Sequence, residues 1–129
     1  MPTKTTSDKK LLVVDDSDII RNLIAKMFAD KFDVLTANDG KEAIEMIASN
    51  PNIIGLLLDL NMPNVDGFEV LNFFKDNNLF EKIPVSIITG DDSKETTEKA
   101  FEYKIVDVLN KPFNENNIKR VVNAMLEFK

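Results

Sequence analysis

Residues 56–67 read LLLDLNMPNVDG, and they join the most hydrophobic segment of the chain directly to a carboxylate. Three leucines precede Asp59, and the turn-forming residues Asn-Met-Pro-Asn follow soon after it. Burying an unpaired charge in an apolar interior is costly. We therefore expect Asp59 at the polar end of a buried strand, beside groups that balance its charge.

On both sides of this stretch, short apolar runs alternate with segments of helical periodicity. Strands are expected over 11–14, 32–37, 53–58, 85–89 and 105–110, and helices over 18–30, 39–49, 66–77, 92–104 and 114–128. This alternation predicts an α/β fold with a five-stranded parallel sheet and helices on both faces. Asp33 and Asp107 interrupt the second and fifth strands, which places these two at the edges. The predicted strand order is therefore 2-1-3-4-5, the flavodoxin-like arrangement.

The composition sets limits on the protein's class. The 129 residues fit one domain, and 22 acidic against 16 basic residues give a formal net charge of -6. This balance argues against a nucleic-acid partner, and no apolar run is long enough for membrane insertion. With no cysteine and no histidine, the chain itself has neither thiol nor imidazole chemistry. We expect residues 1–9 to form a flexible tail and residues 10–129 the domain, in a cytoplasmic protein.

Polar residues stand at the carboxyl ends of four of the predicted strands. They are Asp15 and Asp16 at the first, Asp59 at the third, Thr89 (followed by Gly90) at the fourth, and Lys111 (followed by Pro112) at the fifth. Because neighbouring strand ends meet at one edge of a parallel sheet, the three carboxylates should converge and repel one another. A divalent cation would relieve this repulsion, and carboxylate oxygens suit Mg²⁺.

The same set of residues suits phosphoryl transfer. Asp59 is the candidate nucleophile, Lys111 is within reach of a phosphoryl group on it, and the Thr89 hydroxyl is placed to donate to a phosphoryl oxygen. Each residue alone has a simpler explanation, since an aspartate at a strand end is often a turn residue or a helix cap. Their occurrence together, in order, at four strand ends favours the chemical explanation.

With these residues in place, the chain resembles the response-regulator receiver domain of two-component signalling, the CheY-like family. The resemblance extends over residues 10–128. It is carried by LLVVDDS at 11–17, LLLDLNMPNVDGFEVL at 56–71, VSIITG at 85–90 and NKPF at 110–113.

The resemblance implies a role for each acidic residue. Asp59 matches the phosphoacceptor of the family. Asp16 matches the direct carboxylate ligand of Mg²⁺, and Asp15 the acid that holds a water of the metal. Asn61 matches the residue whose backbone carbonyl completes the metal ligation.

The resemblance also implies a switch and its partners. Thr89 matches the switch hydroxyl, and Lys111 the ion-pairing lysine, whose bond to Pro112 is cis in the family. The phosphoryl donor would be a phosphohistidine on a histidine kinase or a histidine phosphotransfer protein, which agrees with the absence of histidine here. The target protein would bind the face of the fourth helix, fifth strand and fifth helix, where we expect Tyr103 and Lys104.

Three positions depart from the family pattern. Val108 stands where the family usually has tyrosine or phenylalanine, Gly90 where it has alanine, and Lys104 where it has glycine. These changes leave the acids, the threonine and the lysine complete. They put the mode of switching in question, because no aromatic ring is present at position 108.

The function predicted from these residues is a phosphorylation-dependent signalling switch. We expect a freestanding phosphoacceptor, not an enzyme, which promotes its own phosphotransfer and autodephosphorylation. It would either bind a target protein, as a chemotaxis-type regulator does, or relay the phosphate, and the sequence leaves both open. The alternative is a receiver-like interaction module that is not phosphorylated.

Two other classes fit the sequence less well. A haloacid-dehalogenase-like phosphatase would carry a second aspartate at position 61, where this chain has Asn61. A flavodoxin-type electron carrier would need a phosphate-binding loop after the first strand. The sequence there is DDSDII, whose carboxylates would repel a phosphate.

Overall fold

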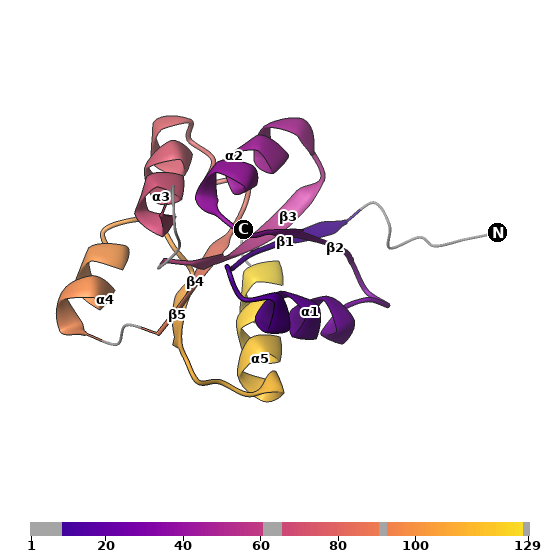
Figure 1. Ribbon diagram of the computed structural model, residues 1–129. Helices are drawn as coiled ribbons and strands as arrows, with labels where there is room; N and C mark the ends of the chain where they lie inside the picture. Colours follow the sequence, from indigo (N-terminus) through magenta and orange to yellow (C-terminus); the bar gives the residue numbers. More distant parts are fainter. Residues whose placement is uncertain (1–8, 61–65, 91–92, 128–129) are drawn as a thin grey trace.

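The computed structural model describes residues 9–60, 66–90 and 93–127, in which five strands alternate with five helices (Figure 1). Their bounds are β1 (Lys10–Val14), α1 (Asp18–Met27), β2 (Asp33–Ala37), α2 (Gly40–Ser49), β3 (Ile53–Asp59), α3 (Gly67–Asp76), β4 (Val85–Thr89), α4 (Lys94–Ala100), β5 (Asp107–Asn110) and α5 (Glu115–Leu126). Each predicted element is therefore present.

The strands form one parallel sheet in the order β2-β1-β3-β4-β5, which confirms the predicted topology. Burial explains this order. The central strands β1, β3 and β4 are buried along almost their whole length, whereas β2 and β5 are largely half-buried. Asp33 and Asp107 lie on these edge strands, where a carboxylate keeps contact with water.

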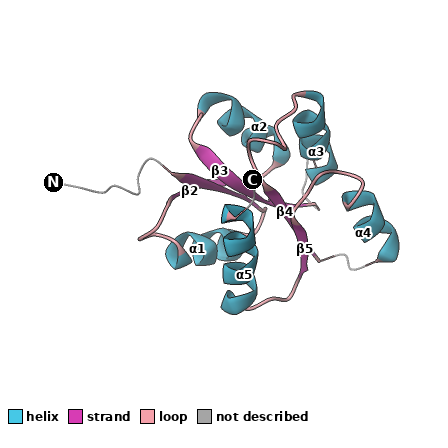
Figure 2. Cartoon of the chain, turned by 180° about the vertical axis from the view of Figure 1, so that it is seen from behind, coloured by secondary structure: helices cyan, strands magenta, loops and turns pink. Residues whose placement is uncertain are grey.

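Helices cover both faces of the sheet (Figures 1 and 2). One apolar cluster joins the sheet to α2, α3 and α4, and it includes Ala43, Phe74 and Ala100. The other joins the opposite face to α1 and α5, through residues such as Ile24 and Ile118. Neither cluster includes Asp15, Asp59 or Thr89, which lie at the carboxyl ends of β1, β3 and β4.

Every helix begins at a polar residue whose side chain accepts a hydrogen bond from the first turn. These N-caps are Ser17, Asp39, Asp66, Ser93 and Asn114. Such caps satisfy backbone N–H groups that have no partner within the helix. Asp66 thus has a structural role as the cap of α3.

The fourth helix is shorter than predicted. The pattern indicated a helix over 92–104, but α4 ends at Ala100. Tyr103 and Ile105 pack against the core on the α3 side, and a continued helix would not direct both of them there. Tertiary packing therefore decides where this helix ends.

Gly67 permits α3 to begin directly against the end of β3. Its N–H donates to the carbonyl oxygen of Leu60, over 3.1 Å. A Cβ at this position would lie 2.6 Å from Leu60 Cα and 2.7 Å from the Asp59 carbonyl oxygen. A side chain would therefore displace the backbone that carries Asp59.

Candidate functional site

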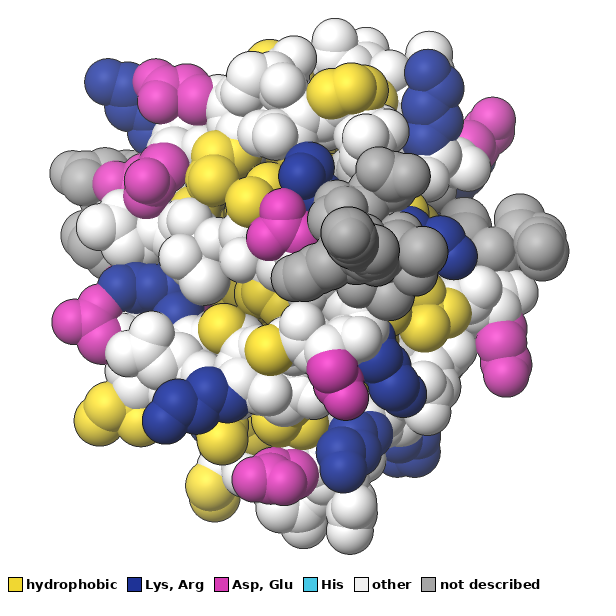
Figure 3. All heavy atoms as spheres, turned by 90° about the vertical axis from the view of Figure 1, so that its right-hand side faces the viewer, with side chains coloured by type: hydrophobic (Ala, Val, Ile, Leu, Met, Phe, Trp, Pro, Cys, Tyr) yellow, Lys and Arg dark blue, Asp and Glu magenta, His cyan; other side chains and the backbone are white. Residues whose placement is uncertain are grey.

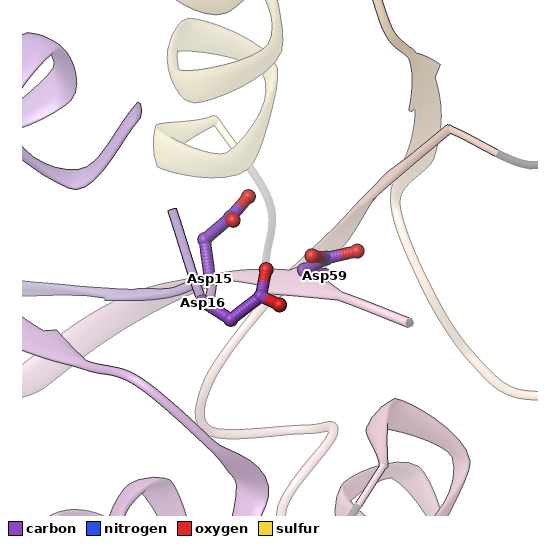
Figure 4. Close-up of side chains that lie close together, drawn as sticks. All are labelled: Asp15, Asp16 and Asp59. Carbon is purple, nitrogen blue, oxygen red and sulfur yellow. The ribbon is translucent and has the colours of Figure 1, made fainter. Parts of the chain in front are cut away.

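Three carboxylates meet at the carboxyl ends of β1 and β3 (Figure 4). Asp15 and Asp16 follow β1, and Asp59 is the last residue of β3. The pairing of Val14 with Leu58 brings these strand ends level. Oxygen atoms of the three carboxylates all lie within 4.8 Å of one another. The predicted convergence is therefore present.

The three acids differ in their exposure to water. Asp15 is 0% exposed and Asp59 is 2% exposed, whereas Asp16 is exposed. Two carboxylates are thus held inside the protein and the third faces solvent.

Asp15 is fixed by several hydrogen bonds. Its Oδ1 accepts from the Ser17 N–H over 2.9 Å, and its own N–H donates to the Ala37 carbonyl oxygen over 3.1 Å. Its carbonyl oxygen accepts from the Arg21 guanidinium over 2.5 Å. These bonds hold the turn between β1 and α1, and so the backbone that presents Asp16.

Lys111 bridges the two buried acids. Its Nζ lies 3.0 Å from Asp15 Oδ2 and 3.5 Å from Asp59 Oδ2. Burial lowers the pKa of the Lys111 ammonium, but the close contact with Asp15 and the charge of Asp59 outweigh it and raise that pKa above 10.5. The lysine is therefore charged at neutral pH. The Lys111–Pro112 peptide bond is cis, as the resemblance implied.

Thr89 lies on the neighbouring strand at the same edge. It ends β4 and is 1% exposed, and its carbonyl oxygen accepts from the Lys111 N–H over 2.8 Å. Asp59 pairs in register with Ile88, so Thr89 lies one residue further along the adjacent strand. Asn61, the remaining predicted site residue, lies outside the described residues.

The donor set fits a divalent cation. Of the described cations, Lys111 forms ion pairs with Asp15 and Asp59, while the nearby Arg21 forms an ion pair with Asp18. Asp15 Oδ2 is buried and accepts no hydrogen bond within the described residues, although the Lys111 ammonium lies 3.0 Å away as an ion-pair partner. The exposed Asp16 has no hydrogen bond or ion pair in that part of the chain. Oxygen ligands of this kind suit Mg²⁺.

Two features of the site were not predicted from the sequence. One is Arg21, which holds the Asp15 carbonyl; a basic residue early in a helix gives no signal of such a contact. The other is that Lys111 lies closer to Asp15 than to Asp59. Both depend on side-chain conformation, which the residue spacing does not specify.

The role of Tyr103 and Lys104 on a target-binding face stays a prediction, and the structure shows how the two residues lie. Lys104 is exposed, but the half-buried Tyr103 turns toward α3, where its hydroxyl donates to Asn72 Oδ1 over 2.7 Å.

On the side of the molecule seen in Figure 3, acidic and basic side chains are interspersed. Among the described helices, none combines the length and apolar character needed to cross a membrane.

Comparisons with known proteins identify the class. The family model of the response regulator receiver domain matches residues 11–123. Two-component response regulator ORR11 of Oryza sativa subsp. indica is 31% identical over 117 residues, which cover 90% of this chain and 80% of that protein. The chain therefore belongs to the response regulator receiver domain family, whose members are signalling phosphoacceptors that act with histidine kinases.

Solved structures agree with this assignment. The receiver domain of Francisella response regulator 1452 has 32% sequence identity and a TM-score of 0.80, covering 94% of this chain and 99% of that one. The chemotaxis protein CheY4 of Vibrio cholerae has 28% identity and a TM-score of 0.80, covering 91% and 98%. The similarity thus spans nearly the whole of both single-domain structures.

Proposed function

We propose that this chain is a phosphorylation-dependent switch in which Asp59 accepts a phosphoryl group from a phosphohistidine. The donor is a histidine kinase or a histidine phosphotransfer protein, because this chain has no histidine. The observation that carries the proposal is the contact of Lys111 Nζ with both Asp15 and Asp59, beside the exposed Asp16. This arrangement combines a nucleophile, a fixed positive charge and oxygen ligands for a metal.

The same carboxylates are the proposed Mg²⁺ ligands. Asp16 and Asp59 would hold the ion directly, Asp15 would hold one of its waters, and the Asn61 carbonyl would complete the protein ligands. When bound, Mg²⁺ neutralises charge on the phosphoryl oxygens during transfer.

In the transfer step, a carboxylate oxygen of Asp59 attacks the phosphorus of the phosphohistidine. A P–O bond forms while the P–N bond breaks, and the electron pair of that bond remains on the imidazole nitrogen, which takes up a proton. Lys111 pairs with a phosphoryl oxygen, and the Thr89 hydroxyl donates to another. Such transfers depend mainly on alignment and charge stabilisation.

The phosphorylated state ends by transfer to a second histidine or by hydrolysis. In hydrolysis, water attacks the phosphorus, the P–O bond to Asp59 breaks, and inorganic phosphate leaves. While Asp59 is phosphorylated, the conformational equilibrium of the domain shifts toward the conformation that a target protein binds. The α4–β5–α5 face is our proposed target surface, with binding of a chemotaxis-type target or a phosphorelay as the two possible outputs.

We also propose that residues 10–129 form the receiver domain, that residues 1–9 form a tail, and that the protein acts in the cytoplasm. The family match over residues 11–123 supports the first of these statements.

Val108 favours a second candidate function, an interaction module that is not phosphorylated, since the usual aromatic partner of the switch hydroxyl is missing.

The deciding experiment is intact mass measurement after incubation with acetyl phosphate and Mg²⁺. The wild-type protein should gain one phosphoryl group, while Asp59→Asn and a chelator-treated sample should gain none. Some receivers react only with a protein donor, so a phosphorylated histidine phosphotransfer protein is tested in parallel. If neither donor modifies the wild type, the interaction module becomes the better function.

A further inference from the structure

The segment between α4 and β5, residues 101–106, is attached to α3 by a tyrosine. The Tyr103 hydroxyl donates to Asn72 Oδ1 over 2.7 Å, joining residues that are 31 positions apart in the chain. The Tyr103 ring is half-buried and belongs to the apolar cluster on this face of the sheet. One side chain thus makes both a polar and an apolar contact with the α3 side of the molecule.

The ring of Tyr103 lies between two phenylalanines. Its centroid is 6.3 Å from that of Phe68 on α3 and 6.4 Å from that of Phe80, which precedes β4. The Lys99 ammonium of α4 lies 4.3 Å from the centre of the Phe68 ring, on its face. Aromatic pairs and cation–π contacts of this geometry are attractive. We call Phe68, Phe80, Lys99 and Tyr103 the α3–α4 clamp.

Apart from this clamp, α4 buries little apolar surface among the described residues. Ala100 is the only residue of this seven-residue helix that is fully buried. Alanine buries little apolar area, so it contributes little to holding the helix in place. The contacts of Lys99 and Tyr103 therefore add to the small apolar area that α4 buries.

The clamp is also connected to the candidate site. Phe68 directly follows Gly67, whose N–H donates to the Leu60 carbonyl oxygen and where an added Cβ would lie 2.7 Å from the Asp59 carbonyl oxygen. A shift of the backbone around Asp59 would therefore reach Phe68 first and Tyr103 next. This is a continuous path of contacts from the phosphoacceptor candidate to α4.

We propose that Tyr103 is a positioning residue that tethers the α4–β5 segment to α3, and that this tether acts as a brake on the switch by stabilising the unphosphorylated arrangement of α4. The tether itself rests on the contacts above, and the brake rests also on the proposed function. If phosphorylation favours a different position of α4, then any bond specific to the unphosphorylated arrangement opposes it.

The tether is tested by amide hydrogen exchange on the unphosphorylated protein. Tyr103→Phe keeps the ring and removes only the hydroxyl, while Asn72→Ala removes only the acceptor. Each substitution should speed amide exchange in residues 101–106 by about two- to fivefold. This factor corresponds to the lower part of the free-energy range of a hydrogen bond, because Asn72 is exposed. Exchange in α1 and α5 should not change.

The double variant identifies the bond as the cause. Because both substitutions remove the same interaction, Tyr103→Phe with Asn72→Ala should speed exchange no more than either change alone. Lys104→Ala is the matched control, since Lys104 is the next residue, is exposed, and makes no hydrogen bond within the described residues. Wild-type exchange in Tyr103→Phe, or additive effects in the double variant, would overturn the tether.

The brake is tested by the rate of phosphorylation with acetyl phosphate, followed by intact mass. Tyr103→Phe should be phosphorylated about two- to fivefold faster than the wild type. The factor is the free energy of the lost hydrogen bond, expressed as a change in the ratio of the α4 arrangements. Equal rates would overturn the brake. A wild-type protein that gains no phosphoryl group from any donor would overturn the proposed function together with the brake, while hydrogen exchange still decides the tether.

Discussion

At the scale of single residues, Lys111 is the cation on which the two buried acids depend. Replacing it with methionine would leave Asp15 and Asp59, 0% and 2% exposed, without their positive partner. Breaking a fully buried pair typically costs about 3–5 kcal/mol. We expect about 1–3 kcal/mol here, because the Lys111 side chain is 25% exposed and water can enter. Urea unfolding at neutral pH measures this loss.

The matched control is Lys10→Met. Lys10 pairs with Asp33 over 3.1 Å, but the Asp33 side chain is 47% exposed, so water can replace the lost partner. This change should cost much less than Lys111→Met. Equal losses in the two variants would show that Lys111 does not balance buried charge.

Tyr103 offers a second prediction at this scale, because it is the only tyrosine and the chain has no tryptophan. Burial and the charge of Glu102 raise the pKa of the Tyr103 phenol above 10.0. The protonated phenol is thus favoured by folding. Its contribution to stability is complete below pH 10.0 and is lost as the pH rises through the raised value.

Absorbance of tyrosinate against pH measures this pKa directly. We expect a midpoint above 10.0 in the folded protein and near 10.0 in concentrated urea. Glu102→Gln should move the folded midpoint down, because it removes a nearby negative charge. A folded midpoint equal to that in urea would contradict both the burial and the effect of Glu102.

At the scale of elements, the junction of β3 and α3 depends on a glycine. In Gly67→Ala, the new Cβ would lie 2.6 Å from Leu60 Cα, and a backbone contact of this kind cannot be relieved by rotating a side chain. We expect a loss of stability of about 1–3 kcal/mol and weaker binding of Mg²⁺, since Asp59 would move with its backbone. Urea unfolding and calorimetric titration with Mg²⁺ test the two effects.

Gly90 provides the control for this prediction. A Cβ there meets no described atom within 4 Å, and the residue is exposed after β4. Gly90→Ala should therefore leave stability within about 0.5 kcal/mol of the wild type. If both alanine variants behave alike, close packing at the β3–α3 junction is not what requires a glycine.

Replacing Ser86 or Ser93 with alanine should change the free energy of unfolding in opposite directions. The Ser86 hydroxyl on β4 is buried and has no hydrogen-bond partner among the described residues, so Ser86→Ala should raise the free energy of unfolding by about 1 kcal/mol. Ser93 caps α4 by accepting from the Thr96 N–H, and Ser93→Ala should lower it by about 0.5–2 kcal/mol. Thermal unfolding of both variants is the measurement, and a destabilised Ser86→Ala would show that its hydroxyl has a partner.

The elements also show how far the sequence could predict this structure. The edge positions of β2 and β5 follow from Asp33 and Asp107, because charge within a strand implies contact with water. The end of α4 was not predictable, because it is decided by packing of Tyr103 on rings that are distant in the chain. Local patterns carry no information about that contact.

The same distinction holds within the site. The meeting of Asp15, Asp16 and Asp59 follows from strand order, since parallel strands bring their carboxyl ends to one edge. The Arg21 contact with the Asp15 carbonyl depends on one side-chain conformation and has no signature in the residue spacing. Topology was therefore predictable from the sequence, whereas the individual hydrogen bonds that fix the acids were not.

At the scale of the whole molecule, the cluster of carboxylates should make stability depend on divalent cations. The chain carries a net charge of -6, and three of its acids lie within 4.8 Å of one another. Without a cation, Asp16 adds to the repulsion around Asp15 and Asp59, so Asp16→Asn should be at least as stable as the wild type. With Mg²⁺, the order should reverse, because a ligand that binds only the folded state stabilises it.

The measurement is the unfolding midpoint with and without Mg²⁺ for three proteins. Mg²⁺ at about 100 times its dissociation constant should stabilise the wild type by about 2.7 kcal/mol, and should barely affect Asp16→Asn. Asp18→Asn, which removes an exposed acid paired with Arg21, should respond like the wild type. Sodium chloride at equal ionic strength separates specific binding from general screening. If the salt reproduces the whole effect, or if Asp16→Asn responds fully to Mg²⁺, then this cluster of acids is not a metal site.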